Sequence, residues 1–174
     1  MANDLETLAG KVESEPENAD LRMDFGVALA EDGQLVRAAE ELEKAIELDP
    51  AMAKAHYNLG VIFGRVLLDD LAVDELWEDH TDEEAYFEKA SACYKEAIKL
   101  EPSMTAALNN LARLCDAMGL HHEAKGHFEA SLKLDENQPD VHEDLQSLIS
   151  REDFSQPEKP APEVGEEDLV EDEE

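Results

Sequence analysis

The chain has 174 residues, enough for one domain with a buried core and a tail. It carries 14 Lys and Arg against 45 Asp and Glu, and the formal net charge of −31 argues against binding nucleic acid or an anionic membrane. The hydrophobic fraction of 43% separates the chain from a disordered polyacid. The sequence has no signal-peptide pattern and no apolar run of membrane length, so we expect a cytoplasmic protein. Cys93 and Cys115 form no CxxC motif, and we expect both thiols to be reduced.

The apolar residues of 1–151 are spaced as in helices almost throughout, and we predict one all-α domain without a β-sheet. In chain order, a first helix covers 3–15, where Leu5, Leu8 and Val12 share one face. Further helices follow between prolines and glycines, which mark their ends. A closing helix covers 139–151.

The last segment, 152–174, is predicted to be a disordered acidic tail. It holds eleven acidic residues, one lysine and three prolines. Like charges repel one another, and so few apolar side chains cannot offset the entropy lost on ordering.

The helix boundaries recur with a period of 34 residues. Pro16 and Pro50 are 34 residues apart, and the sequence around Pro50 returns 52 residues later around Pro102. Three units of 34 residues, with 18 extra residues in the second, explain both spacings. The predicted units are 19–52, 53–104 and 105–138.

These units resemble the tetratricopeptide repeat, a helix–turn–helix unit with a small residue at one helix crossing and large residues around it. The small residue is Gly26, Gly60 and Ala112 in the three units. The leading aromatic residue of the family is replaced in every unit, and the third unit also departs from the pattern in two later positions. The resemblance implies a right-handed superhelical stack, with the helices at 3–15 and 139–151 capping its two ends. The departing residues are Arg22, His56 and Leu108, and then Ser131 and Glu136.

The 18 extra residues, near 66–83, contain eight acids and no Lys or Arg. Thr81 and Glu84 resemble a capping box, which would start the next helix at about 82. One interpretation is a lengthened hairpin whose two helices pack on each other. The other is a projecting arm that contacts a partner through Leu71 and Trp77.

Catalytic and metal-binding motifs are absent from the sequence, so we expect neither an enzyme nor a cofactor. There is no phosphate-binding loop, no HExxH and no nucleophile elbow. His121, His122 and His127 do not have the spacing of two ligands on one helix face.

In the resembled family, the first helix of each repeat lines a concave groove. One groove position recurs as an amide or an acid in the three units and the closing helix, and this resembles the asparagine ladder with which some members hold a peptide backbone. Three basic residues in the same groove, Lys54, Arg65 and Arg113, would suit an acidic peptide or a C-terminal carboxylate. Alternatively, asparagine is simply tolerated on an exposed face and the bases relieve repulsion. The predicted groove residues are Asp24, Lys54, Tyr57, Asn58, Val61, Arg65, Asn109, Asn110, Arg113 and Asp144.

Two functions follow from these patterns. The first is a protein-binding scaffold or adaptor that holds a peptide segment of another protein in the groove. The alternative is an acidic chaperone that shields a basic client through the insertion and the tail. The carboxylate clamp for chaperone tails is disfavoured, because the first groove helix has Met23, Asp24 and Val27 where the clamp needs a base and an Asn. A further hypothesis is that the tail folds onto the basic groove residues and competes with the ligand. The oligomeric state stays open.

Overall fold

In the computed structural model, the backbone is described for residues 2–72 and 81–155, and the side chains for 5–68 and 83–151. Over these residues the regular structure is helical, and the predicted all-α fold without a sheet is confirmed for them. The helices are α1 (Ala2–Ser14), α2 (Ala19–Glu31), α3 (Leu35–Leu48), α4 (Ala53–Ala72), α5 (Thr81–Leu100), α6 (Thr105–Ala117), α7 (His121–Leu134) and α8 (Pro139–Ser155).

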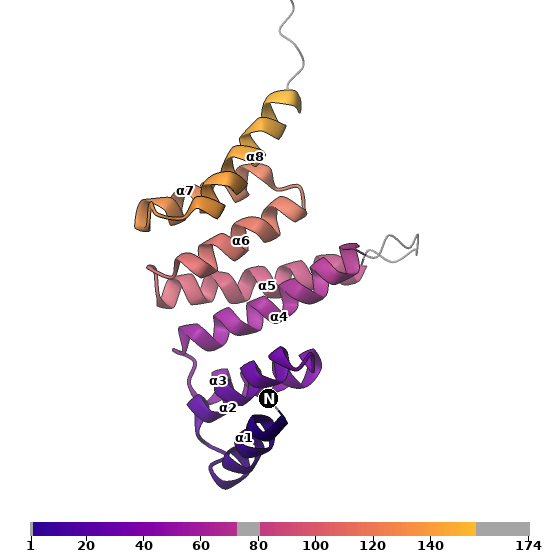
Figure 1. Cartoon of the computed structure of the whole chain (residues 1–174), viewed down its shortest axis with the longest axis vertical. Coiled ribbons are helices and arrows are strands. Elements are labelled where there is room, and N and C mark those ends of the chain that lie inside the picture. The colour runs from indigo at the N-terminus through magenta and orange to yellow at the C-terminus, as the bar shows by residue number, and fades with distance from the viewer. Residues whose placement is uncertain (1, 73–80, 156–174) are drawn as a thin grey trace, which may run out of the picture.

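The helices form hairpins that stack along the long axis of the molecule (Figure 1). The most extensive contacts lie within the hairpins, between α2 and α3, between α4 and α5, and between α6 and α7. The two helices of each hairpin pack side by side. The first helices of successive hairpins also contact one another, α2 with α4 and α4 with α6. These first helices therefore line the inner face of the stack, and α3, α5 and α7 form its outer face.

The buried apolar side chains form two clusters among the described residues. The N-terminal cluster is centred on α2, α3 and the first half of α4, and the C-terminal cluster extends from the end of α4 to α8. The half-buried Phe63 of α4 packs against both clusters. The core is thus continuous, with α4 as the element that joins its two parts.

Small residues allow the helices of a hairpin to approach closely. A Cβ atom added at Gly60 would lie 2.9 Å from Cδ1 and Cε1 of Tyr94 on α5. At Gly26 it would lie 2.9 Å from Cγ of Leu42 and 3.1 Å from the carbonyl oxygen of Ala38. The packing explains why the repeat pattern places glycine at these crossings.

Two of the three residues at the leading aromatic position of the repeat pattern, Arg22 and His56, make polar contacts with the preceding loop. Arg22 Nε donates a hydrogen bond of 2.7 Å to the carbonyl oxygen of Pro16. His56 Nε2 lies 3.1 Å from the carbonyl oxygen of Pro50, also six residues earlier. Arg22 also forms a 2.7 Å ion pair with Glu41 on α3. Burial acts to raise the pKa of the Glu41 carboxyl, but hydrogen bonds from Lys44 and Arg22 outweigh it and lower that pKa.

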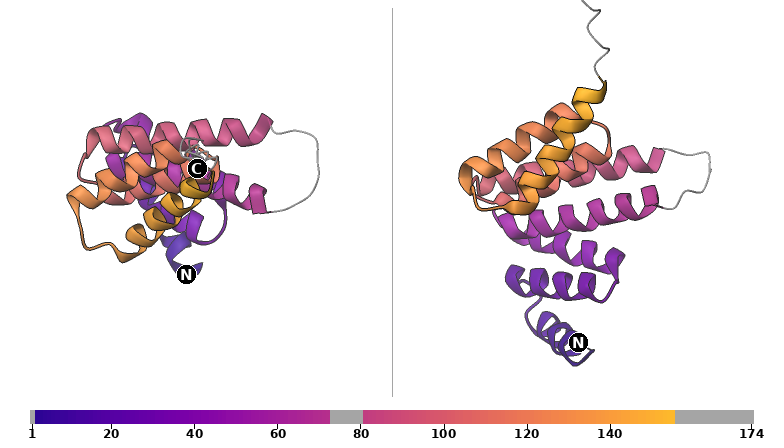
Figure 2. Two further views of the ribbon diagram at one scale, coloured as in Figure 1. Left: turned by 90° about the horizontal axis from the view of Figure 1, so that it is seen from above. Right: turned by 45° about the horizontal axis from the view of Figure 1, so that its top comes forward.

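The turn inside the first and third hairpins is built on a glycine with positive φ, Gly33 at 83° and Gly119 at 74°. In the second hairpin, α4 and α5 are each 20 residues long, compared with 13 or 14 for the helices of the other two hairpins. The ends of α4 and α5 extend beyond the neighbouring helices (Figure 2).

The extra residues up to Ala72 continue α4, and those from Thr81 onward begin α5, as the lengthened-hairpin interpretation expects for these described parts. α5 begins at Thr81, one residue before the predicted start. The arm interpretation concerns Leu71, whose side chain is outside the described set, and Trp77, which lies outside the described residues altogether.

The closing helix is longer than the sequence predicted. α8 ends at Ser155 and the predicted helix at 151, so the first four residues assigned to the tail are helical. The remaining tail residues, 156–174, lie outside the described part of the chain. Over the described residues, every helix is too short or too polar to cross a membrane.

Candidate functional site

A pocket of about 300 Å³ opens on the inner face between α4 and α6. Four of the predicted groove residues line it: Val61 and Arg65 from α4, and Asn110 and Arg113 from α6. Its remaining lining is mostly apolar and comes from Gly64, Leu68, Tyr94 and Leu114. The structure thus gathers part of the predicted stripe around one apolar depression.

A tyrosine–asparagine contact joins α4 to α6 beside this pocket. The Asn110 amide donates a hydrogen bond of 3.2 Å to the hydroxyl of Tyr57. The rings of Tyr57 and Tyr94 lie 6.1 Å apart between centroids, at an interplanar angle of 50°. Burial raises the pKa of Tyr94 well above its usual range, so its hydroxyl stays protonated at physiological pH. Asn110 is therefore held in a fixed orientation at the edge of the pocket.

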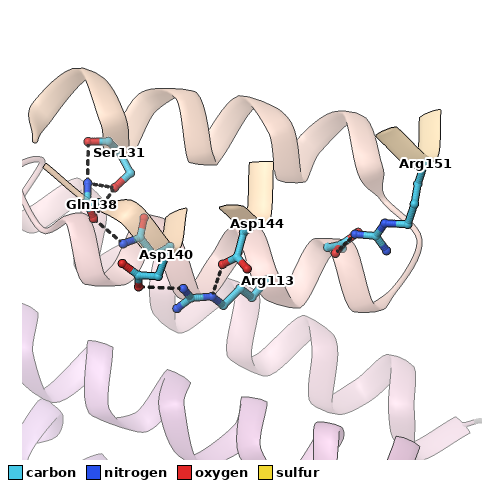
Figure 3. Close-up of polar contacts among 8 residues, drawn as sticks. Arg113, Ser131, Gln138, Asp140, Asp144 and Arg151 are labelled. Carbon is cyan, nitrogen blue, oxygen red and sulfur yellow. Dashed lines mark hydrogen bonds and ion pairs between the residues drawn. The ribbon is translucent and has the colours of Figure 1, made fainter. Parts of the chain in front are cut away.

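Arg113 is held by two carboxylates of the closing helix (Figure 3). Its Nε lies 2.8 Å from an oxygen of Asp144, and its Nη2 lies 3.3 Å from an oxygen of Asp140. The sequence predicted that Arg113 and Asp144 share the groove, but it gave no sign that they pair. All three side chains are substantially exposed, so the pairs contribute little to stability and an incoming carboxylate can compete for the arginine.

The other predicted groove residues on α2 and α4 lie outside the pocket lining. Lys54 and Asp24 are exposed, and Asn58 is half-buried. Lys54, Asn58 and Val61 follow one another at helical spacing on α4, which places them on one side of that helix. An extended ligand that filled the pocket would have to continue along α4 to reach Asn58 and Lys54.

Asn109, also predicted as a groove residue, does not line the pocket. Its side chain is only 9% exposed, and its amide donates a 2.7 Å hydrogen bond to Oε1 of Gln138, in the connection between α7 and α8. Successive residues on a helix point about 100° apart, so only one of two adjacent asparagines can face α4. Oδ1 of Asn109 is buried and accepts no hydrogen bond among the described residues. Asn109 therefore has a structural role on another side of α6.

Gln138 also explains how the third repeat departs from the family pattern. Ser131, in place of the usual alanine, is fully buried, and its hydroxyl lies 3.1 Å from Nε2 of Gln138 (Figure 3). The same Nε2 donates to the carbonyl oxygen of Asp135 at 2.7 Å. The polar substitution is thus satisfied where α7 joins α8.

Tyr94, Leu68 and Leu114 form much of the pocket wall, although none of them is among the groove residues predicted from the sequence. Tyr94 lies on α5, in the second helix of its repeat, whereas the groove residues predicted from the sequence lie on first helices and on the closing helix. The available signal was Gly64: a Cβ there would lie 3.4 Å from the Tyr94 hydroxyl and 3.8 Å from Cδ1 of Leu114. A glycine in the middle of a helix is unfavourable unless a neighbour needs the space.

Groups that could support catalysis or hold a metal are scattered. Among the described residues, no three His, Cys, Asp or Glu side chains are close enough together to hold a metal ion. His121 contacts Asp116 at 3.0 Å, and burial together with Lys95 lowers the pKa of His127. Cys115 is buried, and Cys93 is half-buried with its pKa raised to about 11 by burial and by the Glu43 carboxylate. A thiol with so high a pKa is a poor nucleophile at physiological pH.

Comparison with known families gives repeat matches over most of the helical region. The family model described as "TPR repeat" matches residues 26–66. The model described as "Tetratricopeptide repeat" matches residues 82–104 and 105–138. Together these matches cover more than half of the chain, and they leave out part of the insertion.

A curated relative is the type IV pilus assembly protein PilF of Pseudomonas aeruginosa. It is 29% identical to this chain over 171 residues, which cover 86% of this chain and 65% of the relative. The chain therefore spans slightly less than two thirds of the length of this relative.

Solved structures of repeat proteins share the fold. MamA from Desulfovibrio magneticus RS-1 is 18% identical and superposes with a TM-score of 0.72 over 87% of this chain and 76% of its own. The first TPR of Spaghetti (RPAP3), solved with an HSP90 peptide bound, is also 18% identical. Its TM-score is 0.65 over 78% of this chain and 93% of its own. These similarities show a superhelical stack of helical hairpins.

Proposed function

The chain belongs to the tetratricopeptide repeat family, and we propose that it is a non-enzymatic scaffold that binds a peptide segment of a partner protein on its inner face. A solved structure of this fold, the first TPR of Spaghetti (RPAP3), holds an HSP90 peptide, which supports peptide binding as the function. The observation that carries the proposal is the pocket between α4 and α6, where Val61, Arg65, Asn110 and Arg113 meet.

The chemistry of this pocket favours a ligand with both apolar and acidic groups. Its apolar lining suits one apolar side chain of the ligand. Arg65 and Arg113 flank that lining, and the exposed Lys54 extends the basic charge along α4. A segment with an apolar residue next to a carboxylate would receive charge-assisted hydrogen bonds in a chain that is otherwise strongly acidic.

Replacing Asn58 and Asn110 together with alanine is expected to weaken binding of the partner at least tenfold. Each amide can donate to and accept from a ligand backbone, and losing about 1.4 kcal/mol of such bonding corresponds to a tenfold change in Kd. The partner would be captured with the wild-type chain and identified by mass spectrometry, and its affinity measured by calorimetry.

The matched control is Glu47→Ala, which changes an exposed residue of α3. A partner that binds the double variant and the wild type equally well would place the working site outside the groove.

Neutralising Asp140 and Asp144 as asparagines is expected to strengthen binding of an acidic peptide about two- to fivefold, because Arg113 would lose its two competitors. The measurement is a titration at moderate ionic strength with the peptide segment of the captured partner. A variant with Glu136→Gln and Glu143→Gln removes the same charge from exposed positions and serves as the control. Equal strengthening in both variants would mean that net charge, and not release of Arg113, is responsible.

A second candidate is the acidic chaperone that shields a basic client. It is favoured by the charge of the insertion near 66–83 and of the tail, most of which lies outside the described residues. Salt dependence discriminates the two functions: a complex of a polyanion with a basic client weakens steeply with ionic strength, and groove binding weakens less. The hypothesis that the tail competes for the groove stays a prediction, as does the cytoplasmic location.

The curated relative suggests where the partner acts. We infer that the partner is a component of an assembly such as a type IV pilus, because the similarity to PilF extends over 86% of this chain. Identification of the captured protein tests this inference directly, and a partner unrelated to any filament or envelope assembly would contradict it.

A further inference from the structure

The outer side of the stack holds a second crevice, of about 250 Å³, between α3 and the hairpin of α4 and α5. Its lining shares no residue with the groove pocket. On α4, Val61 and Arg65 line the groove pocket, while the adjacent Ile62 and Val66 line this crevice. Helical geometry thus places the two cavities on different faces of α4.

The floor of the crevice is aromatic. The rings of Phe63 and Tyr86 lie 6.3 Å apart between centroids, and Lys89 Nζ lies 5.5 Å from the centroid of each ring. Cation–π contacts of this kind hold the two rings in place. At the rim, Val36 is 76% exposed, which makes it the most exposed large apolar side chain of the described residues.

The α3 side of the crevice carries two acidic side chains, Glu40 and Glu43, both exposed. Neither forms an ion pair among the described residues, whereas Glu41 on the same helix pairs with Arg22 and Lys44. Glu40 and Glu43 are three residues apart, so they lie side by side on the helix surface. Two carboxylates without partners therefore border an apolar floor.

We propose that this crevice is a second docking surface, which binds a protein segment that presents a large apolar side chain next to a lysine or arginine. The apolar side chain enters between α3 and the Phe63–Tyr86 pair, and the basic residue pairs with Glu40 and Glu43. Charge complementarity selects this occupant, since an acidic residue beside α3 would meet like charge at Glu40 and Glu43. Lys89, the one basic residue of the crevice lining, lies on the other wall against the two aromatic rings. Because the two surfaces do not overlap, the chain can hold two segments at once.

The test is a selection of random dodecapeptides displayed on phage against the full chain, followed by affinity measurements on variants. The crevice variant is Glu40→Lys with Glu43→Lys, and the groove variant is Asn58→Ala with Asn110→Ala. A charge-matched control, Glu13→Lys with Glu129→Lys, changes exposed carboxylates on α1 and α7. Val36→Glu, at an exposed rim position, is a second crevice variant that leaves the α3 carboxylates in place.

We expect one class of selected peptides to carry a large apolar residue beside Lys or Arg. This class should bind each crevice variant at least tenfold more weakly than the wild type, and the groove and control variants with unchanged affinity. The proposal is overturned if no class loses more affinity on the crevice variants than on the control. A failure of the proposed groove function has a different signature, since the groove variant would then bind every class like the wild type.

Discussion

Replacing Phe128 with alanine is expected to lower the free energy of unfolding by about 3–5 kcal/mol. The ring is 1% exposed and lies in the C-terminal cluster, where α7 packs against its neighbours. The substitution removes the largest fully buried side chain of the described residues and leaves a cavity that small neighbours such as Ala112 and Ala124 cannot fill. A domain of this size has about 5–15 kcal/mol of stability in total, so the variant should be close to unfolding at 37 °C.

The measurement is urea unfolding followed by circular dichroism. Val36→Ala removes apolar atoms from a side chain that is 76% exposed, so we expect that control to change stability by less than about 0.5 kcal/mol. Comparable losses in the two variants would mean that Phe128 is not part of a tightly packed core.

Replacing Gly60 with alanine is expected to destabilise the protein by about 1–3 kcal/mol, whereas the same change at Gly126 should stabilise it by up to about 1 kcal/mol. Both glycines lie within helices, where alanine is intrinsically the better residue. At Gly60 the new Cβ would lie 2.9 Å from two ring carbons of Tyr94, and that ring is 3% exposed and cannot move away. At Gly126 no atom outside the local helix lies within 4 Å.

The measurement is thermal unfolding of the two variants beside the wild type. We expect the midpoint temperature to fall for the Gly60 variant and to rise for the Gly126 variant. A gain in stability at Gly60 would show that α4 and α5 can separate at no cost. Close packing of α4 against α5 would then not be the reason for glycine at this position.

Much of the fold could be predicted from the sequence, because the packing imposes a period on it. Gly26, Gly60 and Ala112 recur since the helices of each hairpin cross at the same place, and a crossing tolerates only small side chains. The end of α8 was placed too early because the acidic composition beyond residue 151 was read as tail. Once a helix has formed, adding one more residue costs little free energy, so α8 continues to Ser155. The acidic composition of a segment does not show where such an extension ends.

The candidate site was harder to predict, because it depends on contacts between repeats. The helical period placed Val61, Arg65, Asn110 and Arg113 on one face, and all four line the pocket. The period does not distinguish the adjacent Asn109 and Asn110, whereas in the structure only Asn110 lines the pocket and Asn109 donates to Gln138, 29 residues further along the chain. Ion pairing of Arg113 with α8 is likewise a property of two side chains meeting in space.

The division of the core into two clusters that meet at Phe63 has a mechanical consequence. If the chain were pulled from its two ends, the two clusters would bear the load in series, because each hairpin contacts mainly its neighbours. The N-terminal cluster buries fewer side chains and would yield first, so extension would proceed in two steps. Tyr94 and Leu114, which wall the groove pocket, belong to the cluster that yields second. A tether built from this protein would therefore lengthen under tension before the groove pocket is disrupted.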